Sequence, residues 1–209
     1  GRYIMSNYPS GFSFGIVGTE TASLHNHPNV AIVPEGGNLS HYQLDSYAIS
    51  LNEWTHIAVT ISINQINWYL NGELVETDNI DVTALSQEGT PPDLTIGRGG
   101  SFSGGQYWNG LLDEIGIWTY ILSYAEIQNL YNNDFQILEN NALSFWDFNS
   151  GQGPTLFDLS GNGNDGTING ATWSDDVPTV TNPNLIITEI MDDPSMVSDI
   201  NGEWFEIYN

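Results

Sequence analysis

The most oxygen-rich stretch of the chain is FDLSGNGNDGTINGATW, residues 157–173, where Asp, Asn, Ser and Gly lie between two aromatic residues. Asp158, Ser160 and Asn162 alternate before a glycine, as at the start of an EF-hand calcium loop. The twelfth position counted from Asp158 is Asn169 rather than the bidentate glutamate of such a loop, and the flanking pattern is β. We therefore reject an EF-hand. An oxygen-lined calcium loop and a turn shaped by Asn and Gly alone both stay open.

The histidines offer less chemistry. His25 and His27 are two residues apart in a loop-like stretch without a third ligand nearby, which is typical of solvated polar surface. His56 follows Trp54 in a strand pattern, so we expect it to be packed and hydrogen-bonded rather than catalytic.

Composition limits the class of partner. Hydrophobic residues make up 40% of the 209 residues and aromatic residues 12%, which is enough to form a core. Against 26 Asp and Glu residues stand only Arg2 and Arg98, so the net charge is -24. Such a charge repels phosphate backbones and anionic membranes, and we expect no nucleic-acid partner. The absence of cysteine excludes disulfides, thiol catalysis and cysteine-based zinc sites.

The setting predicted from these features is extracellular. An acidic surface fits a saline environment, and no apolar run approaches the roughly 20 residues that a membrane-spanning helix needs, so we expect no membrane insertion. The N-terminal GRYIMSNYPS has no signal-peptide pattern, and we interpret the chain as part of a longer secreted or cell-surface protein.

Period-two alternation predicts strands along most of the chain. Residues 54–62 alternate clearly, and residues 66–76 predict a hairpin around Asn71 and Gly72, because both turn positions favour positive φ. Ser123 and Glu126 form a capping box at the start of one short helix. Further strands are expected in residues 11–18, 30–37, 93–100 and 109–120, a linker in 174–184, and two strands of another module in 185–209. This turn-rich antiparallel pattern indicates a sandwich or jelly roll.

Three stretches in order resemble one family: EWTHIAVTISINQINWYLNGELV, LTIGRGG and YWNGLLDEIGIWTYILSYAEIQNLYNN. Their Trp-x-His strand, Asn-Gly hairpin, Gly-x-x-Asp-Glu strand and capped helix resemble the laminin-G-like, concanavalin A-like sandwich domains of bacterial secreted proteins. The resemblance covers residues 1–135. It implies an all-β, antiparallel concanavalin A-like jelly-roll sandwich with one short helix, whose first strands are missing here.

The later segments carry two further resemblances. Residues 143–173 resemble the start of a second such domain, although here they follow the helix. Residues 136–173 are then either a partial laminin-G-like repeat in a fragment of a modular protein, or a segment that docks on the first sandwich and supplies its missing edge. Residues 185–209 resemble the opening of a lamin-tail domain, a partial immunoglobulin-like module.

The first resemblance also implies a structural calcium. In the family, the loop that matches residues 158–164 is associated with calcium, together with the aspartate of the Gly-x-x-Asp-Glu strand. The matching positions are Asp113, Asp158, Asn162 and Asn164. Oxygen atoms of Asp113 and Asp158 would then converge on one ion.

Catalysis finds little support. Glucan-hydrolysing relatives of this fold carry Glu-x-Asp-x-x-Glu on one strand face, whereas Asp113 and Glu114 are adjacent and are expected to point to opposite faces. No Gly-x-Ser-x-Gly elbow occurs. We therefore predict that the chain is not an enzyme.

Aromatic residues in loops predict binding instead. Tyr107 and Trp108 follow a glycine-rich loop, and Tyr42 and Tyr47 lie in a polar stretch, so either pair is a candidate platform for a sugar. Trp54, Trp118 and Trp146 lie in strand patterns and are expected in the core. We hypothesise a noncatalytic recognition or adhesion module that binds carbohydrate or extracellular matrix. An accessory domain of a secreted hydrolase and a structural spacer in an adhesin remain alternatives.

Overall fold

The chain forms two compact units, Gly1–Pro178 and Thr179–Asn209. The computed structural model describes residues 2–7, 12–17, 26–33, 39–81, 93–99, 107–135 and 138–178, and the backbone of residues 186–191 and 204–208.

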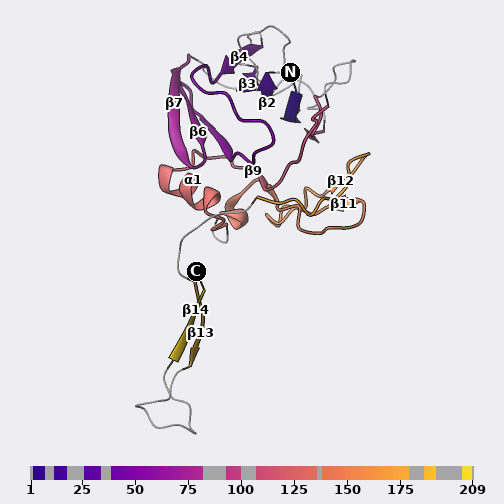
Figure 1. Ribbon diagram of the computed structural model, residues 1–209. Helices are drawn as coiled ribbons and strands as arrows, with labels where there is room; N and C mark the ends of the chain where they lie inside the picture. The colour runs from indigo at the N-terminus through magenta and orange to yellow at the C-terminus, as the bar shows by residue number, and fades with distance from the viewer. Residues whose placement is uncertain are drawn as a thin grey trace. The chain divides into compact units, whose positions relative to one another are not determined.

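The first unit contains two main antiparallel sheets (Figure 1). The larger has the order β4-β3-β2-β1-β8 and consists of β1 (Arg2–Ser6), β2 (Phe12–Val17), β3 (His27–Ile32), β4 (Ser40–Gln43) and β8 (Thr95–Ile96). The smaller has the order β5-β6-β7 and consists of β5 (Ile57–Ile61), β6 (Gln65–Leu70) and β7 (Glu73–Asn79). Two shorter pairs join β9 (Ile115–Ile117) to β10 (Ser144–Trp146) and β11 (Thr155–Leu156) to β12 (Gly166–Thr167).

The two main sheets bury one apolar core between them. Val30 and Ile32 of β3 share a cluster with Ile66 and Trp68 of β6, and all four are almost completely buried. The Trp68 indole N–H donates to the Asp78 carboxylate at 2.7 Å, which satisfies its polar group without exposing the ring. The expected all-β sandwich is therefore confirmed.

The predicted hairpin and helix pack together on the far side of the smaller sheet. Asn71 and Gly72 connect β6 to β7 with φ values of 49° and 78°. Helix α1 (Tyr124–Tyr131) begins after Ser123 with the predicted capping box. Its Ile127 and Leu130 join a second cluster with Tyr69 of β6 and with Leu138, which precedes a short 3-10 turn (Glu139–Asn141). Because Trp68 and Tyr69 are neighbours in a strand, one faces the main core and the other faces the helix.

The segment that follows the helix belongs to the first unit. In register, Ser144 pairs with Ile117 and Trp146 with Ile115, so β10 lies directly beside β9. Trp146 and Leu156 enter the main core, against which Ile168 and Trp173 also pack. The origin of this segment as a partial repeat stays a prediction.

The second unit is described by its backbone alone. Strand β13 (Ile186–Met191) pairs antiparallel with β14 (Trp204–Tyr208), with a register shift between Ile187 and Glu189. The two expected strands are present, and the lamin-tail resemblance stays a prediction.

Candidate functional site

The oxygen-rich loop connects β11 to β12, and Asp158 organises it. Oδ1 of Asp158 accepts the backbone N–H groups of Phe145 and Ser160, both at 3.0 Å. Oδ2 accepts the Ser160 hydroxyl and the Asn164 backbone N–H, both at 2.9 Å. Burial alone would raise the pKa of Asp158, but these hydrogen bonds outweigh it and lower the pKa. A carboxylate has about four lone-pair sites, so the protein itself already uses the acceptor capacity of Asp158.

The asparagines of the loop clamp the start of β10. Asn162 Nδ2 donates to the carbonyls of Ala142 and Leu143 at 3.0 and 3.1 Å, and Asn164 Nδ2 donates to Leu143 at 3.0 Å. The hydroxyls of Ser144 and Ser160 approach the same Leu143 oxygen at 2.9 and 3.3 Å. With the Ser160 hydrogen donated to Asp158, three donors crowd one carbonyl oxygen, which has two lone pairs. The loop is a hydrogen-bonded clamp around the first residues of β10.

Asp113 lies in a separate group of carboxylates. Its Oδ1 accepts the Glu114 backbone N–H at 3.1 Å, and the Asp147 carboxylate acts on both residues. Burial first, then the charges of Asp113 and Asp147, raises the pKa of Glu114 to about 7. Burial is also the main reason that the pKa of Asp113 is raised. The contacts described for Asp113 do not include the loop of Asp158.

The expectation that Asp113 and Glu114 alternate along a strand is wrong. Strand β9 begins only at Ile115, and Glu114 has a left-handed φ of 51°, so pleat alternation does not apply to the pair. Within the described ranges, no group of three or more His, Cys, Asp or Glu side chains could hold a metal ion. This finding does not concern ligation by backbone or Asn side-chain oxygens, which calcium also accepts.

The histidines have structural positions. His25 lies outside the described residues. His27 is not solvated surface, because it opens β3 as a buried residue and its Nδ1 lies 2.7 Å from the Leu44 carbonyl oxygen. His56 packs its ring against Tyr131 at a centroid distance of 5.8 Å, but its buried Nδ1 has no hydrogen-bond partner. The expected packing is therefore present and the expected hydrogen bond at Nδ1 is not.

The aromatic candidates separate by exposure. Tyr107 is 59% exposed, and the Arg98 guanidinium lies over its ring, 5.8 Å from the centroid. Trp108 packs partly against the main core, and its indole N–H donates to the Leu111 carbonyl at 3.2 Å. Tyr42 likewise packs against the core, whereas Tyr47 is 45% exposed. In each of the two predicted pairs, therefore, one side chain is exposed: Tyr107 in the first and Tyr47 in the second.

The three strand tryptophans also differ. Trp146 is in the main core and Trp118 packs against the second cluster, as expected. Trp54 belongs to neither cluster, and its indole N–H donates to Asp176 at 3.3 Å in an exposed position. The sequence analysis did not identify Arg98 as a neighbour of Tyr107. The chain has only two cationic Lys or Arg residues, and that scarcity could have marked Arg98 as a candidate.

Comparison with known families settles the ancestry of the sandwich. A family model of the concanavalin A-like lectin/glucanases superfamily matches residues 2–128, more than half of the chain. The chain belongs to this superfamily. A search of curated proteins finds no match.

A solved structure supports the same fold for this superfamily member. A candidate carbohydrate binding protein from Bacteroides ovatus ATCC 8483 superposes with a TM-score of 0.61 at 17% sequence identity. The match covers 83% of this chain and 50% of that chain, so the chain spans half the length of that protein. Among the described residues, no helix has the length and apolar character needed to cross a membrane.

Proposed function

We propose that the chain is a noncatalytic carbohydrate-binding module. The observation that carries the proposal is the Tyr107 ring, 59% exposed on a lectin-like sandwich and held beside Arg98 through an antiparallel bridge. Exposed aromatic faces give sugars a stacking surface. The solved relative is itself described as a candidate carbohydrate binding protein, which supports the same class of ligand here.

A glycan array tests the proposal directly. The wild-type chain should bind at least one glycan class, and Tyr107→Ala should weaken that binding while leaving the melting temperature within about 2 °C, because an exposed substitution changes stability little. Tyr120→Ala is the matched control, since Tyr120 is an exposed tyrosine elsewhere in the unit. An array without signal at high protein concentration would instead favour the structural spacer.

The noncatalytic part of the proposal concerns Asp113 and Glu114. The raised pKa of Glu114 would suit a general acid. Acid–nucleophile catalysis needs a second carboxylate placed across a bound sugar, and the two adjacent residues flank a strand end rather than line one strand face. We expect no release of reducing ends from any glycan that the chain binds. Release that disappears in Glu114→Gln would make the chain an enzyme.

Calcium is part of the proposed function. The saturated carboxylate of Asp158 fits a metal poorly, because an ion there would have to replace at least one of its four hydrogen bonds. The crowded Leu143 carbonyl fits better, since rotating the amides of Asn162 and Asn164 would present their oxygens to an ion beside it. In this proposal Asp113 would supply a carboxylate, and a bound cation would favour its charged form.

Two substitutions separate these possibilities. If calcium binds through Asp113, millimolar calcium should raise the melting temperature of the wild type by mass action, and Asp113→Asn should remove that rise. Asp158→Asn should lower the melting temperature with or without calcium, because it replaces one of the two acceptor oxygens of the clamp with an NH2 donor. A melting curve that calcium leaves unchanged would count against the ion.

The biological setting we propose is a secreted or cell-surface protein in which this module acts in adhesion. The expected lamin-tail segment would be a neighbouring module of the same protein. An accessory role beside a hydrolase domain is the second candidate. Sequencing the gene on either side of these residues distinguishes the two.

A further inference from the structure

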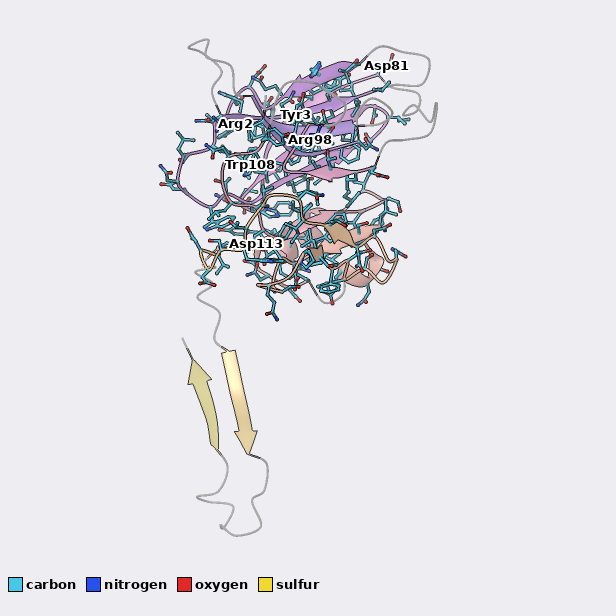
Figure 2. The ribbon with its side chains drawn as sticks, turned by 90° about the vertical axis from the view of Figure 1, so that its right-hand side faces the viewer. Arg2, Tyr3, Asp81, Arg98, Trp108 and Asp113 are labelled. Carbon is cyan, nitrogen blue, oxygen red and sulfur yellow. The ribbon has the colours of Figure 1, made fainter. Side chains whose placement is uncertain are left out.

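Both arginines of the chain lie at the same edge region of the larger sheet. Arg2 begins β1, and Arg98 follows β8, which pairs with β1. The register Met5 to Ile96 continues through the hydrogen bond from Gly97 N–H to the Ile4 carbonyl at 2.7 Å. Arg98 directly follows Gly97, and Arg2 lies two residues before Ile4 in β1. Figure 2 shows Arg2 and Arg98 on the same side of the first unit.

This placement is unusual for the charge of the molecule. The chain has 26 acidic residues, two arginines and no lysine. Both arginines are exposed, and within the described part of the chain neither guanidinium forms an ion pair with a carboxylate. Arginines scattered among so many acids would be expected to pair with some of them. The two side chains therefore keep their charge and hydrogen-bond donors available to a ligand.

An open aromatic ring stands next to the arginines. Arg98 bridges to Tyr107 in an antiparallel pairing, and the Trp108 backbone N–H donates to the Gly97 carbonyl at 2.8 Å, which fixes this segment to the end of β8. Figure 2 shows Arg2, Tyr3, Arg98 and Trp108 on the side of the first unit that faces the viewer. The Arg98 guanidinium lies over one face of the Tyr107 ring, 5.8 Å from the centroid, and the Tyr107 side chain is still 59% exposed.

We propose that Arg98, with Arg2 and Tyr107, forms a subsite for an acidic sugar residue, one that carries a carboxylate or a sulfate ester. This inference rests on the proposed function and specifies its ligand class. The planar guanidinium fork matches the paired oxygens of these anions, and the Tyr107 ring offers a stacking face for the pyranose that bears them.

The strongly negative molecule does not oppose such binding at close range. Exposed charges farther away than about 8 Å are largely screened at 0.15 M salt, so distant carboxylates act only weakly on an anion at Arg98. The surrounding negative field instead discriminates against anionic polymers that miss this subsite. Binding should therefore depend on Arg98 far more than on net charge.

The test measures binding of the 209-residue chain to two matched pairs of polymers in 0.15 M NaCl at pH 7. Polygalacturonate is compared with its methyl ester, and dextran sulfate is compared with dextran. EDTA is present throughout, because calcium could otherwise bridge the acidic protein to an acidic polymer. The two pairs also report which anion, carboxylate or sulfate, the subsite takes.

Three variants locate the interaction. Arg98→Gln should weaken binding to the acidic polymer about tenfold or more, the usual size of a lost charge-assisted hydrogen bond. Arg98→Lys should recover part of that loss, since it keeps the charge and loses the fork. Asn129→Asp, on an exposed position of α1, changes the net charge by the same amount and should leave binding within about twofold.

Each outcome decides the inference. Preference for one or both acidic polymers, lost in Arg98→Gln and kept in Asn129→Asp, supports it. Binding of the neutral polymers alone, or equal losses in the two variants, overturns the subsite and leaves carbohydrate binding standing. If the chain binds none of the four polymers and no glycan on the array, the proposed function fails together with the inference.

Discussion

Protonation of His56 should destabilise the sandwich in mildly acidic solution. Its backbone is fixed to the hairpin turn, because its N–H donates to Asn71 Oδ1 at 3.0 Å and its carbonyl accepts the Asn71 N–H at 2.9 Å. The ring packs against Tyr131, so turning it toward water would break that contact. Burial of this unpartnered ring lowers the pKa of His56 from 6.5 to about 4.

The size of the effect follows from linkage. Because the folded pKa lies below the unfolded value, the unfolded chain binds the proton more readily and stability is lost as the pH falls below 6.5. With values of 6.5 and about 4, the loss between pH 8 and pH 5 is about 2 kcal/mol. For a unit of this size, that corresponds to a fall of roughly 4 to 8 °C in melting temperature.

The comparison with His56→Phe isolates this contribution from the titration of the carboxylates. Phenylalanine keeps an aromatic ring against Tyr131 and cannot bind a proton. Denaturant unfolding of both proteins from pH 8 to pH 5 should therefore show the wild type losing about 2 kcal/mol more than the variant. Parallel stability curves for the two proteins would refute the assignment of a buried, neutral histidine.

Three further substitutions test other parts of the fold. Ser123→Ala removes the capping box of α1 and should cost about 1 kcal/mol in the free energy of unfolding measured with denaturant. A methyl group at Gly15 would lie 2.2 Å from the Arg2 carbonyl oxygen, so Gly15→Ala should cost about 2 kcal/mol or more, whereas Gly166→Ala, whose added carbon meets its nearest neighbour at 3.5 Å, serves as the tolerated control. Glu114 has a raised pKa, so its stabilising protonated form is lost as the pH rises through about 7, and Glu114→Gln with EDTA should gain stability over the wild type between pH 5 and pH 8. If Ser123→Ala or Glu114→Gln were as stable as the wild type, the cap or the raised pKa of Glu114 would be contradicted. If Gly15→Ala were as stable as Gly166→Ala, the close contact at Gly15 would be contradicted.

The local elements could be predicted because their causes are local. The Asn71-Gly72 turn needs two positive φ values, and the Ser123 cap needs one side chain three residues from its partner amide. Alternation likewise located most strands. Strand ends were less predictable, since β9 is only Ile115–Ile117 within a longer apolar run. There the left-handed Glu114 interrupts the pleat, and nothing in its neighbours signals that backbone choice.

Contacts between distant residues were the part that sequence could not supply. The pairing of Arg98 with Tyr107 crosses a glycine-rich loop, and the packing of β10 on β9 joins residues on either side of the helix. Both depend on the register in which strands pair. A slip of one residue in that register turns every side chain of the strand to the other face of the sheet. The bulge between Tyr3 and Met5 is one such shift, in the pairing of β1 with β2.

The loop at Asp158 shows why a motif rich in oxygen atoms does not identify an ion. The same Asp, Ser and Asn residues can turn their oxygens toward a cation or toward backbone N–H groups, and the choice depends on the path of the chain around them. Here glycines with positive φ, Gly161 and Gly163, bend the loop so that the Asn164 N–H points at the Asp158 carboxylate. The same bend brings the loop against β10, where Phe145 both donates to Asp158 and accepts from Leu159 at 2.8 Å. The charge of Asp158 is thus balanced by oriented N–H groups, as an ion would balance it, and removing calcium should leave this clamp closed.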